Sequence, residues 1–125
     1  TYINASYLNQ AIAYEFIQRG WMDENLEQLK DLYRPRLDAL LAALEAEFSG
    51  RAEWVKPQGG FFVGLNLTED GRVPDRGAQH NAGLALSESR GFFIDGGERF
   101  IRLPFCALTP EQIREGVFRL AQFIK

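Results

Sequence analysis

An arginine interrupts an apolar stretch near the C-terminal end of this 125-residue sequence. The stretch is Phe-Ile-Arg-Leu-Pro-Phe, residues 100–105, which places Arg102 in the middle of a predicted strand. A guanidinium is planar and charged, and its fork matches a carboxylate with two parallel hydrogen bonds. Spacing alone leaves two interpretations open. Arg102 binds an anionic ligand, or it is structural, on an exposed sheet face or in an internal ion pair.

The other residues whose types could carry chemistry form no recognisable site. His80 is the only histidine, and no nucleophile arrangement surrounds it, so we expect a solvated loop histidine. The only cysteine, Cys106, is expected to be a small buried hydrophobe. One histidine and one distant cysteine predict no metal site. The three lysines, Lys30, Lys56 and Lys125, are expected to be exposed and not activated as nucleophiles.

Glycine and aromatic pairs mark turns and strands rather than a known motif. Residues 58–60 and 95–97 each contain a glycine pair but lack the spacing and following helix of a phosphate loop, so both are predicted to be turns. The phenylalanine pairs at 61–62 and 92–93 could line a pocket. Core packing is the default expectation for aromatic residues in strands.

The N-terminal half of the sequence predicts two helices. Apolar residues recur at four-residue spacing over residues 6–19, and Gly20 follows as a stop signal. A longer apolar period begins near Asp23, a good N-cap, and continues to residue 49. Pro35 lies inside this second helix and lacks a backbone donor, which predicts a kink or a break at residues 32–34.

The period then changes from 3.6 to 2, which predicts strands. We expect a β-hairpin around the turn at 57–60, a surface loop over residues 68–77, a short strand at 84–86 and a second clear strand at 100–105. In that last strand Arg102 shares a face with Phe100 and Pro104. Thr109, Pro110 and Gln112 then predict a capped helix over residues 110–124.

These elements predict one domain, residues 1–125, with an α/β fold of the α+β type. Helices within 6–49, a hairpin and strands within 52–106 and a final helix over 110–124 would form a small, mostly antiparallel sheet covered on one face by helices. The composition is that of a globular protein, with 46% hydrophobic residues and a net charge of −3. It indicates neither nucleic-acid binding nor a membrane segment, and the single cysteine favours a reducing, cytoplasmic location.

Three stretches in order carry a family resemblance: residues 32–41, beginning Leu-Tyr-Arg-Pro-Arg, residues 57–65, Pro-Gln-Gly-Gly-Phe-Phe-Val-Gly-Leu, and residues 91–105, from Gly-Phe-Phe-Ile-Asp to Arg-Leu-Pro-Phe. Together with the helix after Thr109 they resemble the C-terminal small domain of class I/II (fold-type I) pyridoxal-phosphate-dependent aminotransferases, nearest the 2-aminoadipate and valine–pyruvate aminotransferase-like branch. Residues 88–91 and the polar linker at 68–83 depart from the family pattern, which leaves the substrate open.

The resemblance implies a function for the full-length protein. Such enzymes move an amino group between an amino acid and a 2-oxo acid with pyridoxal phosphate as cofactor, and they are commonly homodimers. The arginine that binds the substrate carboxylate would be Arg102. The lysine that holds the cofactor covalently belongs to the large domain, upstream of Thr1, so no catalytic residue is expected in this chain. The chain alone is expected neither to bind pyridoxal phosphate nor to catalyse amino transfer.

Two other functions fit the same sequence. The first is the ligand-sensing, aminotransferase-like domain of a transcription regulator, which an upstream helix-turn-helix would indicate. The second is a freestanding α+β binding module without a cofactor, because a fold does not fix a function.

Overall fold

The computed structural model describes residues 6–68, 71, 73, 76–81, 83–86, 91 and 93–124. The elements are α1 (Tyr7–Gln18), α2 (Trp21–Phe48), β1 (Ala52–Trp54), β2 (Phe62–Leu67), α3 (Arg76–Asn81), β3 (Phe100–Pro104) and α4 (Pro110–Phe123). The chain divides into two compact units, an N-terminal unit of residues 1–34 and a C-terminal unit of residues 35–125. The helix α2 runs through the boundary between them, and each unit is described by itself below.

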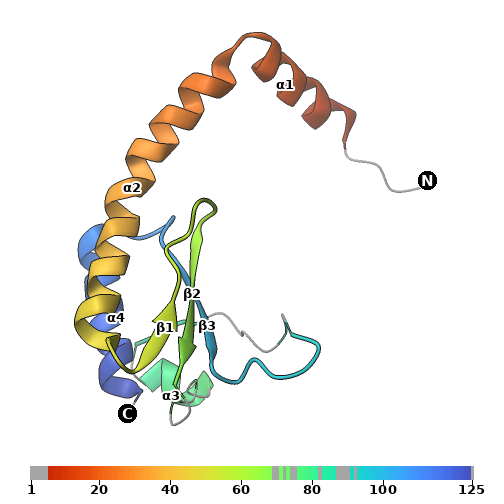
Figure 1. Ribbon diagram of the computed structural model, residues 1–125. Helices are drawn as coiled ribbons and strands as arrows, with labels where there is room; N and C mark the ends of the chain where they lie inside the picture. The colour runs from red at the N-terminus through yellow and green to blue at the C-terminus, as the bar shows by residue number, and fades with distance from the viewer. Residues whose placement is uncertain are drawn as a thin grey trace. The chain divides into compact units, whose positions relative to one another are not determined.

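The C-terminal unit is built around a three-stranded antiparallel sheet in the order β1-β2-β3. The C-terminal half of α2 and the whole of α4 lie on the same face of this sheet (Figure 1). This arrangement confirms the predicted α+β fold, with a small antiparallel sheet covered on one face by helices.

Strand alternation and helix periodicity together form the core. In β2 and β3, every second side chain is buried, as period-2 strands with one covered face require. The largest fully buried side chains come from both helices and both of these strands: Leu40, Leu44, Phe48, Val63, Leu65, Ile101 and Leu120. The hydrophobic effect of this burial holds the helices on the sheet.

Two sets of polar contacts fix the ends of the helices in this unit. At the start of α4, the Thr109 side chain accepts from the Gln112 backbone N–H, and the Gln112 side chain accepts in return from the Thr109 N–H at 2.9 Å. This confirms the predicted capping box. At the other end, the Arg51 guanidinium donates to the carbonyls of Glu47, Ala121 and Ile124. Arg51 therefore ties the C-terminal ends of α2 and α4 together.

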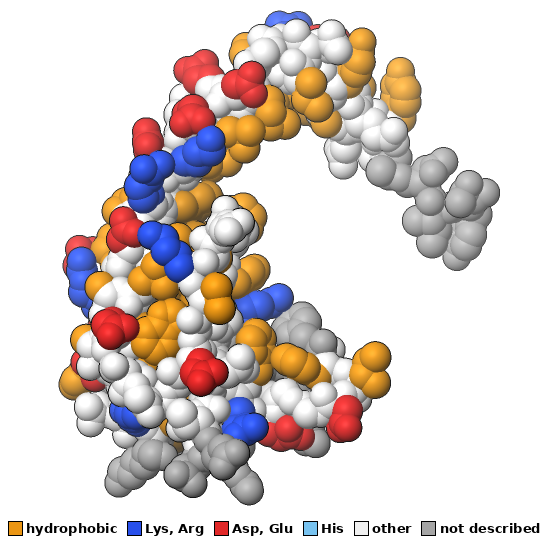
Figure 2. Space-filling view, in the orientation of Figure 1, with side chains coloured by type: hydrophobic (Ala, Val, Ile, Leu, Met, Phe, Trp, Pro, Cys, Tyr) orange, Lys and Arg blue, Asp and Glu red, His pale blue; other side chains and the backbone are white. Residues whose placement is uncertain are grey.

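The N-terminal unit has no core of its own among its described residues. No residue of α1 is buried, and large apolar side chains are exposed, including Leu8 and Ile12. Figure 2 shows hydrophobic side chains on the surface over α1 and the start of α2. Some apolar side chains do contact each other: at the turn between the helices, Phe16 packs edge to face against Trp21, with 5.8 Å between ring centroids. Among the described residues, no helix is both long and apolar enough to span a lipid bilayer.

Two of the sequence-based predictions about elements are wrong, and a third is narrowed. Of the kink or break predicted at residues 32–34, the break is absent, since α2 continues through Pro35 to Phe48 and burial of Ala39 and Leu40 holds the turns that follow. Asp23 does not begin this helix, which starts at Trp21. Residues 84–86 form no strand, because Leu84 donates to the Gln79 carbonyl and the Leu86 N–H donates to the Gln79 side chain.

Candidate functional site

The sheet face opposite the helices carries Arg102. The register pairs Arg102 with Gly64, Phe100 with Asn66, Pro104 with Phe62 and Glu53 with Asn66, so these side chains share one face, called the Arg102 face below. Their neighbours in β3, Ile101 and Leu103, are buried on the helix-covered face. The predicted assignment of faces in β3 is therefore confirmed.

Arg102 is half-buried, and its Nε atom is buried. Its guanidinium carbon lies 4.2 Å from the centroid of the Phe62 ring, which is a cation–π contact. The Phe62 ring thus lies against the guanidinium. The fork of a guanidinium suits recognition of a planar anion such as a carboxylate.

Two glycines, Gly64 and Gly97, lie in close contact with aromatic rings, and Gly64 pairs with Arg102. A Cβ added to Gly64 would lie 2.8 Å from a ring carbon of Phe100, and one added to Gly97 would lie 2.6 Å from the ring of Phe93. The two rings meet edge to face with centroids 5.2 Å apart. The strand position opposite Arg102 is thus kept free of a side chain, and the Phe100 ring approaches it.

The phenylalanine pair at 61–62 does not form core. Phe61 is 47% exposed and Phe62 is 38% exposed, so the default expectation of core packing is wrong for this pair. Phe93 is also exposed, and residue 92 lies outside the described residues. Phe62 lies on the Arg102 face, and Phe93 contacts Phe100 of that face, so both add apolar surface near Arg102.

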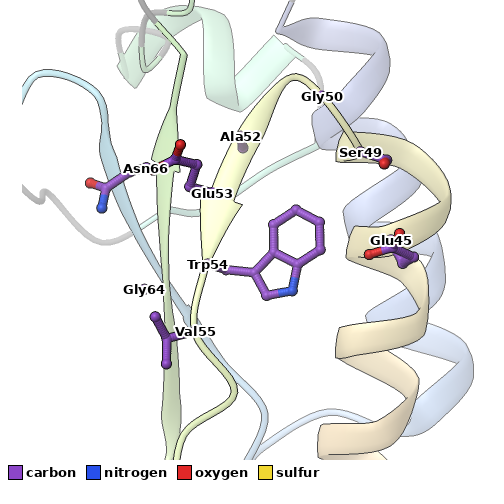
Figure 3. Close-up of a pocket in the computed structure, with 9 residues that line it drawn as sticks. All are labelled: Glu45, Ser49, Gly50, Ala52, Glu53, Trp54, Val55, Gly64 and Asn66. Atoms are coloured by element: carbon purple, nitrogen blue, oxygen red, sulfur yellow. The ribbon is translucent and has the colours of Figure 1, made fainter.

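A hollow of about 800 Å³ lies beside the edge strand β1. Trp54 lies between β1 and the end of α2 in this hollow, with Glu45 on the helix and Glu53 and Asn66 on the strands (Figure 3). Arg102 does not line it. Among the residues that the structure describes, no cluster of histidine, cysteine and carboxylate side chains could hold a metal ion.

The other candidate residues from the sequence form no second site within the described ranges. His80 is exposed in the last turn of α3. Cys106 is half-buried rather than buried, and its carbonyl accepts a hydrogen bond from Arg36. Lys30 is ion-paired with Glu27 at 2.7 Å on the exposed surface of α2. Lys56 is exposed after β1, and Lys125 lies outside the described residues.

Sequence reasoning singled out Arg102 but did not identify Phe62 and Gly64 as its neighbours. Both stand in the alternating stretch Phe-Val-Gly-Leu-Asn of β2, so their common face was available from the pattern. The register that places these residues beside Arg102 could not be predicted from the pattern, because it depends on how β2 pairs with a strand more than thirty residues later.

Comparison with known proteins gives consistent matches along the chain. No protein-family model matches it. The sequence is 33% identical to an aromatic-amino-acid aminotransferase of Thermococcus litoralis over 94% of this chain and 28% of that protein. The structure matches a multiple substrate aminotransferase of Thermococcus profundus with a TM-score of 0.80 and 37% identity, over 92% of this chain and 29% of that one.

Two further matches bear on the cofactor and on the alternative function. An α-aminoadipate aminotransferase of Thermus thermophilus, solved in complex with N-(5'-phosphopyridoxyl)-L-leucine, has a TM-score of 0.74 and 32% identity over 93% of this chain and 30% of its own. A helix-turn-helix-type transcriptional regulator of Bacillus subtilis, YdfD, is 25% identical over 97% of this chain and 25% of its own length.

Fold and sequence similarity agree along the chain. It is similar over nearly its whole length to one segment of known aminotransferases, which confirms the resemblance seen in the sequence to the C-terminal small domain of class I/II pyridoxal-phosphate enzymes. The chain spans about 30% of the length of the relatives that it matches.

Proposed function

We propose that this chain is the small domain of a pyridoxal-phosphate-dependent aminotransferase and that Arg102 binds the α-carboxylate of the amino-acid substrate. The observation that carries the proposal is the half-buried Arg102, whose guanidinium lies against the Phe62 ring and which pairs with a strand position without a side chain. A rigid strand that presents a planar fork orients a planar anion, and orientation of the substrate is a large part of catalysis.

The cofactor is assigned to the rest of the full-length protein. In amino transfer, pyridoxal phosphate supplies an electron sink for the bond changes at the substrate's α-carbon. Neither lysine described in this chain is placed to hold that cofactor covalently, because Lys30 is paired with Glu27 on the surface and Lys56 is exposed. We therefore expect this chain alone to be inactive, while its own residues bind the substrate carboxylate and exclude water from the site.

The full-length protein is proposed to act in the cytoplasm, as a homodimer, on an amino acid and a 2-oxo acid. Aminotransferase relatives at 33% and 37% identity support the reaction class. The identity of the amino donor depends on residues beyond this chain as well as on the Arg102 face.

The visible absorption spectrum of the full-length protein tests this proposal. We expect a cofactor band that changes when an amino donor is added. In an Arg102→Ala variant, the second-order rate constant of that change should fall about 100-fold, which corresponds to about 3 kcal/mol for the two charge-assisted hydrogen bonds that are lost together. A protein that shows no cofactor band even after pyridoxal phosphate is supplied would contradict the proposal.

A transcription regulator is the second candidate function, favoured by the similarity to YdfD. In that case the same domain would sense a ligand and the full-length protein would bind DNA through an upstream helix-turn-helix. Specific DNA binding that a small molecule changes, without turnover of any amino donor, would favour the regulator over the enzyme.

A further inference from the structure

Arg102 and Phe62 are diagonal neighbours on one face of the sheet. Phe62 pairs with Pro104 and Arg102 pairs with Gly64, which puts the two side chains one step apart across the β2–β3 ladder. Their separation of 4.2 Å, from guanidinium carbon to ring centroid, is short for a cation–π contact. The ring therefore lies against the guanidinium from a neighbouring position on the same sheet face.

From this geometry we infer that Phe62 is a positioning residue, which holds the Arg102 guanidinium in place for binding the substrate carboxylate. The inference rests on the carboxylate-binding role proposed for Arg102. An arginine side chain is long and flexible and loses much rotamer freedom when it binds an anion. A ring that holds the guanidinium in its binding orientation reduces that loss before the substrate arrives.

The residues across the ladder from Arg102 and beside it on β3 support a positioning role for aromatic rings. The position across the ladder is Gly64, and the Phe100 ring approaches it so closely that a Cβ there would lie 2.8 Å from a ring carbon. Phe100 is in turn held edge to face against Phe93. Aromatic rings thus flank Arg102 on both strands, and no side chain of β2 stands directly opposite it.

A positioning role differs measurably from direct contact between Phe62 and the substrate. Phe62 is 38% exposed, so its ring could also touch the substrate side chain. Loss of a direct contact would slow an amino acid and the amine without its carboxylate by the same factor. Loss of positioning would slow only the substrate that has the carboxylate.

The test uses the full-length protein loaded with its cofactor and measures how fast the cofactor band changes with an amino acid and with the decarboxylated amine of the same side chain. The ratio of the two second-order rate constants is the carboxylate preference. Phe62→Leu should lower this preference about threefold to tenfold, in line with a cation–π contact at a half-buried site. Phe62→Tyr, which keeps the ring, should retain it, and Phe118→Leu, an exposed phenylalanine on α4, serves as the control.

The outcomes separate this inference from the proposed function. A preference that does not fall in Arg102→Ala overturns the proposed role of Arg102 and the inference with it. A preference that falls in Arg102→Ala but is unchanged in folded Phe62→Leu, as judged by circular dichroism, overturns the inference alone. Equal slowing of both substrates in Phe62→Leu also overturns it, because that result marks a direct contact with the substrate. In the double variant, Phe62→Leu should add no further loss of preference.

Discussion

Gly64 lies directly opposite Arg102 in the register of β2 and β3. The backbone of Gly64 has no unusual φ, so the absence of a side chain there is explained by space and not by conformation. Its neighbour in that space is the ring of Phe100, 2.8 Å from where a Cβ would be. The glycine therefore allows an aromatic ring to lie beside the arginine.

Gly64→Ala should destabilise the chain by about 1–3 kcal/mol, because the added methyl group must displace the Phe100 ring, as in other overpacked sites. The free energy of unfolding in urea measures this effect. Gly116→Ala is the matched control, since a Cβ at Gly116 meets no atom within 4 Å in α4. That control should stabilise the chain by about 0.5–1 kcal/mol through helix propensity. Equal effects of the two substitutions would contradict the role of the Phe100 contact.

Arg51→Gln should lower the free energy of unfolding by about 1–3 kcal/mol, because three helix-end carbonyls lose a charged donor. Arg114→Gln removes an exposed ion pair with Glu111 at 3.6 Å and should change the free energy by less than about 0.5 kcal/mol. Chemical denaturation of both variants under identical conditions makes the comparison. Similar losses in both would show that Arg51 does not link α2 to α4.

Thr109→Ala should cost about 1 kcal/mol of stability, the usual effect of removing an N-cap side chain. Gln122→Ala, on the exposed surface of the same helix, should change stability by less than about 0.5 kcal/mol. Thermal unfolding followed by circular dichroism distinguishes the two. A Thr109 variant as stable as wild type would mean that the capping box does not stabilise α4.

The exposed apolar side chains of residues 7–34 should make the isolated chain self-associate, since α1 has no buried residue and a helix of its length is marginal alone. Sedimentation velocity over a range of concentrations should show species larger than a monomer. Ile12→Glu should shift the distribution towards monomer, whereas Phe118→Glu, at an exposed apolar residue of the C-terminal unit, should not. A chain that stays monomeric at every concentration would contradict this expectation.

Features fixed by neighbouring residues were predictable from the sequence. Thr109 and Gln112 lie three residues apart in one turn of chain, so their capping box follows from local geometry. The alternation of Ile101, Arg102 and Leu103 likewise predicts which side chains are buried, because successive side chains of a strand point to opposite faces and only one face of this sheet is covered.

Features that depend on distant contacts were not predictable. Gln79 holds residues 84–86 in a non-strand conformation with its own side chain and carbonyl, and no apolar pattern reports such a bond. The burial of the helix turns that follow Pro35 is a tertiary effect as well, and it outweighs the missing donor of that proline. The cation–π contact of Arg102 with Phe62 depends on the register between β2 and β3, which the sequence alone does not specify.

Carboxylate binding by Arg102 can be measured without any reaction, as the affinity of the full-length protein for a simple carboxylate that competes with the amino-acid substrate. Titration calorimetry on wild type, Arg102→Ala and Arg99→Ala provides the comparison, with Arg99 as an exposed arginine just before β3. We expect affinity about 100-fold weaker in Arg102→Ala and within about twofold of wild type in Arg99→Ala. Equal affinity in wild type and Arg102→Ala would show that Arg102 does not bind the carboxylate.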